Sequence, residues 1–326
     1  MLDKESRVGK HISYAEVSLS EVLFEYVASQ HAGGAMKRKV AVIADAPAAV
    51  PQDVVDKLDI GIVPLHAIID GKDYPETEVD MDWLLERLER KGNVPTTSAS
   101  SIGEFLVAYE RAAEHADSIV SLHMTGKFTK TYEAALEARK MCLEKHPDMR
   151  IEAVDTQTVE AGEMPIALEA ARLAMDGADF DEVVRRAYEV RDAICSLYCF
   201  ETLFFRDKGG RIFKAKPWAE AEENSGTGFK AMIEVDHSTD GTVQLVGRAR
   251  VKRQLIGKMA TIAADRVGSG KLAGAIVHIR AEEDAMYLKR LLEDNVDVES
   301  LVISHGRAVT AIQNGIGIVT FGFHRL

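Results

Sequence analysis

The sequence predicts an α/β fold of two packed domains. Apolar runs of strand length alternate with amphipathic helical patterns over the first half of the chain, which is typical of a mainly parallel sheet flanked by helices. Beyond residue 228, two strand-like runs are joined by the short turn Asp240-Gly241, which indicates antiparallel pairing and a smaller, mixed second α/β domain. With 326 residues, of which 46% are hydrophobic, the chain is long enough to bury two cores.

Four strands are expected in the first domain, at residues 40–44, 60–65, 118–122 and 151–154. Two helices should cover this sheet. The first presents the stripe Trp83, Leu84, Leu85 and Leu88; the second begins at a capping box of Ser101 and Glu104 and presents Ile102, Phe105, Leu106 and Tyr109. Because ligands in open α/β sheets bind beyond the carboxyl ends of the strands, the loops after Asp45, Leu122 and Asp155 should gather into a site.

The second half is expected to contain helices at 165–175 and 180–194, strands at 229–235, 243–247, 272–279, 301–304 and 316–323, and a helix carrying Tyr287, Leu288, Leu291 and Leu292. The polar segment 220–227 is typical of a mobile loop. Residues 1–37 have a capping box from Ser18 to Glu21 and are expected to be an appendage with a short amphipathic helix. The predicted boundaries are therefore 1–37 for the appendage, 38–165 for the N-terminal domain and 166–326 for the C-terminal domain.

Composition argues against several classes of function. A formal net charge of -12 opposes attraction to nucleic acid phosphates and to anionic membranes. One basic stretch contains Arg248, Arg250, Lys252, Arg253 and Lys258; a solvated face is the usual meaning of such a run, although it leaves a regulatory or interaction module as a third hypothesis. No apolar run reaches the length of a membrane span, so the expected location is the cytoplasm.

Three cysteines, Cys142, Cys195 and Cys199, have no CxxC spacing and are expected to be packing residues in a reducing compartment. Two glycine motifs fail as nucleotide sites. The Gly126-Lys127 pair has Ser121 where a Walker A loop needs its first glycine, and Gly315-Ile316-Gly317 has no helix after it. We therefore expect no cofactor. Because paired histidines at metal-ligand spacing are also absent from the sequence, we expect no metal site either.

Small hydroxyl side chains gather in two predicted loops. Residues 96–101 precede a helix, and Thr125, Thr129 and Thr131 follow a strand. Hydroxyls beside helix N-termini suit a carboxylate or phosphate, and simple N-capping is the alternative. A third motif, Gly209-Gly210-Arg211, is typical either of an anion clamp or of a tight turn with a solvated arginine.

The order of these motifs resembles the DegV family of fatty-acid-binding proteins over residues 38–326. The matching pieces are residues 42–46, 62–65, 97–101, 127–132, 154–156, 202–203, 208–212, 246–248 and 315–317. The resemblance implies a non-catalytic carrier with a two-domain DegV-like fold. Its fatty-acid carboxylate would lie between the domains and the acyl chain in an apolar tunnel of the second domain. It also implies a partner, the ATP-dependent kinase of a bacterial fatty-acid kinase system.

Carried over residue by residue, the resemblance assigns the carboxylate to Thr97, Ser98 and Thr129. It places Lys130, Gln313 and Gly315 beside them. Gly209, Gly210 and Arg211 are assigned to a mobile rim of the second domain, which contacts the kinase or gates the tunnel. The sequence departs from the family pattern at four of its positions. Gln313 stands in place of histidine, Ile316 of proline, Ala46 of serine and Lys130 of glycine. Lys130 either pairs with the anion or points outward. The four changes are expected to alter the choice of ligand or to remove the coupling to the kinase.

Two principal hypotheses follow from these residues. The first is a cytosolic fatty-acid-binding protein. The second is an enzyme that acts on a small anionic substrate in the same cleft, with Asp45, Asp155 and Arg211 as its polar groups, although no base and nucleophile pair is recognisable. A long apolar tunnel would favour binding, and a short polar cleft would favour chemistry.

Overall fold

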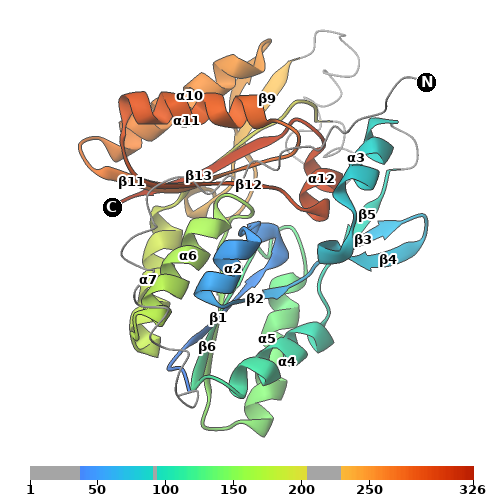
Figure 1. Cartoon of the computed structure of the whole chain (residues 1–326), viewed down its shortest axis with the longest axis vertical. Coiled ribbons are helices and arrows are strands. Elements are labelled where there is room, and N and C mark those ends of the chain that lie inside the picture. Colours follow the sequence, from blue (N-terminus) through green and yellow to red (C-terminus); the bar gives the residue numbers. More distant parts are fainter. Residues whose placement is uncertain (1–36, 91–93, 204–228) are drawn as a thin grey trace, which may run out of the picture. The chain divides into compact units, whose positions relative to one another are not determined.

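The computed structural model describes residues 37–90, 94–203 and 229–326 (Figure 1). The expectations for residues 1–36, for the loop at 220–227 and for Gly209, Gly210 and Arg211 lie outside these ranges. In the described part of the chain, no helix is long and apolar enough to cross a membrane.

The first sheet has four parallel strands in the order β2-β1-β6-β7, as the alternation of elements predicts. Each expected strand is present, with ends shifted by one or two residues. The strands are β1 (Ala41–Asp45), β2 (Ile60–Val63), β6 (Ser118–His123) and β7 (Arg150–Asp155).

Helices cover both faces of this sheet because its strands alternate apolar side chains between two cores. Ile43 and Ile119 pack in one core with α4 and α5, whereas Val42 and Val120 pack in another with α2, α6 and α7 (Figure 1). The helices are α2 (Gln52–Leu58), α4 (Ile102–Ala113), α5 (Thr131–Lys145), α6 (Glu163–Met175) and α7 (Phe180–Ala193).

The second sheet is mixed, as expected, with six strands in the order β10-β9-β8-β13-β11-β12. Only β11 and β12 are parallel; the other pairs are antiparallel. Helices α10 and α11 cover one face (Figure 1). The elements are β8 (Cys195–Cys199), β9 (Lys230–Glu234), η3 (His237–Thr239), β10 (Gln244–Ala249), α10 (Lys252–Val267), β11 (Lys271–His278), α11 (Glu282–Asn295), β12 (Asp297–His305), α12 (Ala308–Asn314) and β13 (Val319–Arg325).

Helix α6 lies between the two sheets, and the backbone just before this helix closely approaches a strand of the second sheet. A Cβ atom added to Gly322 of β13 would lie 2.0 Å from the carbonyl oxygen of Ala161, just before α6. The core on this face of the first sheet also includes Ala275 and Val277 of β11. Helices α6 and α7 thus contribute to the core of the first sheet, and the proposed domain boundary after residue 165 remains a prediction.

A third, antiparallel sheet was not expected from the sequence. Its order is β4-β3-β5, and η1, η2 and α3 complete the described elements. The prediction of a loop at residues 96–98 is wrong, because Thr97 pairs with Ala67 in this sheet. The elements are η1 (Ala46–Ala48), β3 (His66–Ile69), β4 (Lys72–Pro75), η2 (Glu76–Glu78), α3 (Met81–Glu89) and β5 (Thr96–Ser98).

Several local predictions can be compared directly with the structure. The capping box of Ser101 and Glu104 is confirmed, with the Ser101 side chain accepting from the Glu104 amide at 3.2 Å. The cysteines are confirmed as buried packing residues. The predicted helix stripes are wrong at Trp83 and Ile102, which are 44% and 41% exposed. Both stand in the first turn of a helix on the solvent side, and Arg87 lies 5.9 Å from the Trp83 ring.

Candidate ligand-binding site

The loops at the carboxyl edge of the first sheet do gather, as predicted, and two carboxylates hold them. Asp45 is fully buried; its Oδ1 lies 2.9 Å from His123 Nδ1, and its Oδ2 accepts from the Met124 amide at 2.9 Å. Asp155 Oδ2 accepts from the Gly126 amide at 3.2 Å. Asp45 and Asp155 therefore position the loop that leads from β6 to α5.

A direct contact joins two of the residues assigned to the carboxylate. Gln313 of α12 donates from Nε2 to Thr97 Oγ1 of β5 at 2.7 Å. The amide oxygen of Gln313 is buried and has no hydrogen-bond partner among the described residues. These two residues are 216 positions apart in the chain, so only the packing of α12 against the third sheet brings them together.

Glu76 holds the helix that carries Gln313. Its Oε2 accepts from the amide of Val309, in the first turn of α12, at 3.1 Å. The side chain is 2% exposed. Burial raises the pKa of Glu76 to about 7, although the Val309 hydrogen bond and the nearby Arg307 charge lower it in part. The sequence does not predict this role, because Glu76 follows a proline in a polar segment that is typical of an exposed turn.

The remaining residues assigned to the carboxylate lie at three other positions. Thr129 Oγ1 is 3.0 Å from Thr131 Oγ1 at the start of α5. Lys130 is 84% exposed and forms an ion pair with Glu133 at 2.7 Å, which corresponds to the outward orientation. Ser98 is exposed at the end of β5. No described hydrogen bond or ion pair joins any of these side chains to Thr97.

Gly315 ends α12 in a conformation that requires glycine. Its φ is +82°, in the region that L side chains rarely adopt. Its amide donates to the carbonyl of Ala311 at 2.9 Å. Gly315 therefore sets where the helix stops, two residues after Gln313.

An apolar cluster surrounds α12, and we call it the α12 cluster. Its buried members come from β3, α3, β8, β9 and α12, and they include Tyr198, Phe200 and Ile233. Partly buried apolar side chains pack on its outside: Tyr74, Val79, Met81, Val94, Phe128, Val243, Leu245 and Ile316. The polar pair of Thr97 and Gln313 thus adjoins a large apolar core, because Ala311 and Ile312 of the same helix belong to the cluster.

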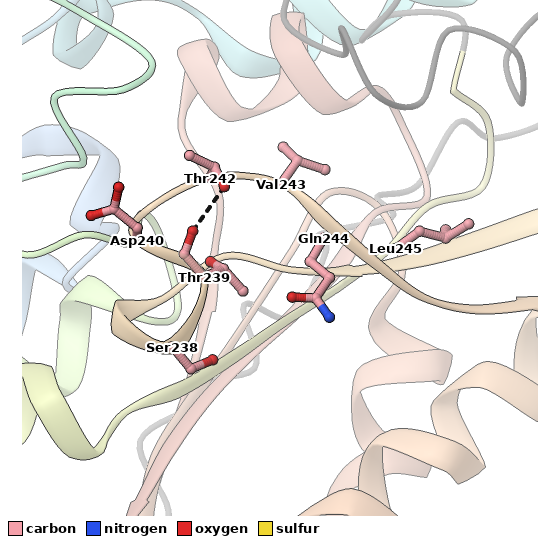
Figure 2. Close-up of a pocket in the computed structure, with 7 residues that line it drawn as sticks. All are labelled: Ser238, Thr239, Asp240, Thr242, Val243, Gln244 and Leu245. Carbon is pink, nitrogen blue, oxygen red and sulfur yellow. Dashed lines mark hydrogen bonds between the residues drawn. The ribbon is translucent and has the colours of Figure 1, made fainter.

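A pocket of about 480 Å³ opens beside η3 and β10. Figure 2 shows its lining residues, in which hydroxyl groups at one end give way to apolar side chains at the other: Ser238, Thr239, Asp240, Thr242, Val243, Gln244 and Leu245. Val243 and Leu245 also pack on the α12 cluster. The pocket therefore shares an apolar wall with that cluster, although neither Thr97 nor Gln313 lines it.

The loop that lines this pocket is bound to the carboxyl edge of the first sheet. Thr125 Oγ1 donates to the carbonyl of Gly241 at 3.1 Å. Lys127 Nζ lies 3.0 Å from Asp240 Oδ2. The sequence placed Thr125 near the ligand, but its hydroxyl is used to hold this loop.

A second buried carboxyl lies close to Asp45. Glu163, at the start of α6, is fully buried. Burial, together with the charges on Asp45 and Asp155, raises the pKa of Glu163 well above its ordinary value. The first turn of α6 therefore adds a carboxyl group that favours its neutral form, and the sequence pattern gave no sign of it.

Comparison with known proteins bears on the family and the fold of this chain. Residues 39–325 match the model of a family described as uncharacterised protein, DegV family. A DegV domain-containing protein of Clostridium perfringens is 29% identical over 293 residues, covering 88% of this chain and 99% of its own length. A DegV domain-containing protein of Streptomyces coelicolor is 30% identical, covering 87% of this chain and 98% of its own.

Solved structures share the fold over nearly the same range. A DegV family protein from Thermus thermophilus, described for its fatty-acid binding, has a TM-score of 0.77 and 26% identity, covering 89% of this chain and 100% of its own. A stearic-acid-binding protein from Eubacterium ventriosum has a TM-score of 0.76 and 19% identity, covering 88% and 98% of the two chains. The match of one family model to residues 39–325, with the same fold throughout, means that this chain belongs to the DegV family.

Proposed function

We propose that this protein binds one long-chain fatty acid and does not transform it. The carboxylate is held at Thr97 and Gln313, with Thr129 and Ser98 as further donors, and the acyl chain lies along the α12 cluster. The observation that carries the proposal is the Gln313–Thr97 hydrogen bond of 2.7 Å at the edge of that cluster. The Thermus thermophilus relative, described as binding fatty acid, supports the same class of ligand.

The acyl tail and the carboxylate are expected to contribute unequally to the free energy of binding. Burying about fourteen methylenes at ~0.8 kcal/mol each gives ~11 kcal/mol before the costs of association. A hydrogen bond to a charged carboxylate contributes roughly 1.5 to 3 kcal/mol. The apolar surface would supply most of the affinity, and the hydroxyl and amide donors would fix the position of the head group.

The enzyme hypothesis has less support from the same residues. Asp45 and Asp155 would be its polar groups, yet their carboxylates are hydrogen-bonded to loop amides, and Asp45 is fully buried. Arg211 lies outside the described residues. A carrier needs only hydrogen-bond donors beside apolar side chains, and the position of Thr97 and Gln313 next to the α12 cluster supports that choice.

A partner follows from the same proposal. A carboxylate held by neutral donors, without a buried lysine, remains available to a second protein, which suits a carrier that passes the acid to an ATP-dependent fatty-acid kinase. We assign Gly209, Gly210 and Arg211 to contact with that kinase or to gating, because the hydroxyl and amide groups already account for the carboxylate.

The decisive experiment measures the ligand directly. Native mass spectrometry of the full chain should show a co-purified acyl chain, and delipidated protein should take up palmitate or oleate. Thr97→Ala and Gln313→Ala should each weaken binding by roughly 10-fold or more, as expected for a lost hydrogen bond to a carboxylate. Thr96→Ala, an exposed neighbour on the same strand, is the matched control and should bind normally.

A fatty alcohol of equal length tests the head-group assignment. The wild type should bind it more weakly than the acid, and the Thr97→Ala variant should bind both about equally. No bound acyl chain together with no uptake would reject the proposal. Conversion of the bound acid into a new product by this chain alone would contradict the proposal that the protein does not transform its ligand.

A further inference from the structure

Two histidines meet at the carboxyl ends of the two parallel strands in the second sheet. His278 ends β11 and His305 ends β12, and the two residues are partners in the strand register. Their ring centroids are 4.5 Å apart, with the rings inclined at 63°. The two imidazoles therefore share one small volume at the edge of the sheet.

A carboxylate completes this group. Glu282, the first residue of α11, places Oε1 4.0 Å from His305 Nδ1. One ligand atom from each of His278, Glu282 and His305 lies within 4.8 Å of the other two. Two imidazoles and one carboxylate are a donor set found in zinc sites that keep an open position.

The protonation state of the buried histidine suits a metal ion. His278 is 3% exposed. Burial, assisted by the neighbouring His305, lowers the pKa of His278 to about 4. Its Nδ1 accepts a hydrogen bond from the amide of Ala281 at 3.4 Å, so this unprotonated nitrogen is directed toward the start of α11, next to Glu282. A metal ion bound through this nitrogen would take the place of that hydrogen bond.

The other two side chains give access from solvent. The side chains of His305 and Glu282 are 60% and 46% exposed. Ligand atoms around tetrahedral zinc lie roughly 3.4 Å apart, as follows from bonds of about 2.0 to 2.2 Å. The exposed side chains therefore need to move inward by about 1 Å, and a water would be the fourth ligand.

The donor atoms favour a transition metal over calcium or magnesium, although the surrounding charges oppose any cation. The N-terminus of α11 disfavours any cation, and Lys252 adds a positive charge nearby, although its Nζ is paired with Asp284 at 2.7 Å. Calcium and magnesium would need several oxygen ligands, whereas this group has one carboxylate. Nitrogen donors bind zinc well enough to compensate.

We propose that His278, Glu282 and His305 form a binding site for a divalent transition metal, with zinc as the favoured ion. The ion would join the ends of β11 and β12 to the start of α11. It would therefore stabilise the second sheet, independently of any fatty acid bound near α12.

Titration of the chelator-treated full chain with zinc chloride tests the proposal. Isothermal titration calorimetry should give a stoichiometry of one, and cobalt should produce the absorption bands of a four-coordinate site. His305→Ala and Glu282→Gln change exposed side chains and should retain the fold, which circular dichroism checks. Each should weaken zinc binding by at least about 10-fold. Even the loss of a residue that only hydrogen-bonds to a metal ligand has an effect of this size.

His115→Ala is the matched control. His115 is an exposed histidine 3.8 Å from Glu114, so it offers the same kind of His–Glu pair in a part of the chain far from the proposed site in sequence. Its variant should bind zinc as the wild type does. Zinc binding that survives His305→Ala unchanged, or that falls equally in His115→Ala, would overturn the proposal, as would the absence of zinc binding in the wild type.

Discussion

Replacing Glu76 by glutamine should make the protein more stable at alkaline pH and leave its stability unchanged at acidic pH. Glu76 is buried under α12 and accepts a hydrogen bond from Val309 at 3.1 Å. Glutamine has nearly the same shape and retains an acceptor oxygen for this amide. The substitution therefore removes the ionisable carboxyl group and preserves the hydrogen bond from the Val309 amide.

The magnitude follows from the pKa of this carboxyl. Burial raises the pKa of Glu76 from 4.5 to about 7, so the folded state binds this proton more tightly than the unfolded state. The stability due to the proton is fully present below pH 4.5 and is lost as the pH rises through 7. At about 1.4 kcal/mol for each pH unit, the loss is about 3 kcal/mol. The variant should gain that amount over the wild type at pH 8 and nothing at pH 4.5.

Urea unfolding of both proteins between pH 4.5 and pH 8.5 measures this difference. Other buried groups also titrate, so the informative quantity is the variant's free energy of unfolding minus that of the wild type. Glu78→Gln, in the same turn but exposed, is the control and should show no pH-dependent difference. A Glu76→Gln difference that stays flat with pH, or a variant less stable than the wild type at pH 8, would refute the reasoning.

Two further substitutions have defined outcomes. Gly322→Ala should destabilise the protein by about 3 kcal/mol or more in urea unfolding. Its Cβ would lie 2.0 Å from the backbone oxygen of Ala161, and neither backbone can easily move. Gly257→Ala is the control: its Cβ would meet nothing within 4 Å, so the variant should be as stable as the wild type or slightly more stable. Arg211→Ala should leave fatty-acid affinity within about twofold while reducing phosphorylation of the bound acid by a fatty-acid kinase, and loss of acyl binding would instead place Arg211 in the pocket.

The parts of the fold that the sequence predicted are those with strong periodicity. The strands of the first sheet are continuous apolar runs because helices cover both of their faces, and long helices such as α7 have clear apolar stripes. The third sheet was missed because its strands have only three or four residues, and β5 is the polar sequence Thr-Thr-Ser. Helix α12 was missed because its seven residues are too short a stretch to establish a helical period.

The candidate site was predicted only in part, for a similar reason. Ser101 could be assigned as a cap from residues three positions apart, and the structure confirms it. The contact between Thr97 and Gln313, and that between His278 and His305, depend on strand register and helix packing. Glu76 acquires its properties from burial, which its polar neighbours in sequence do not indicate.

The loop that lines the pocket next to β10 bears on how easily that pocket can widen. It is fastened to the first sheet partly through Lys127 and Asp240, which are 47% and 72% exposed, and an exposed ion pair contributes little free energy, typically 0 to about 1 kcal/mol. Local opening of a segment costs only the contacts that the segment itself makes. Releasing this loop costs that ion pair and the hydrogen bond from Thr125 to Gly241. This is less free energy than unfolding either sheet, so the pocket beside β10 can widen while both sheets stay folded.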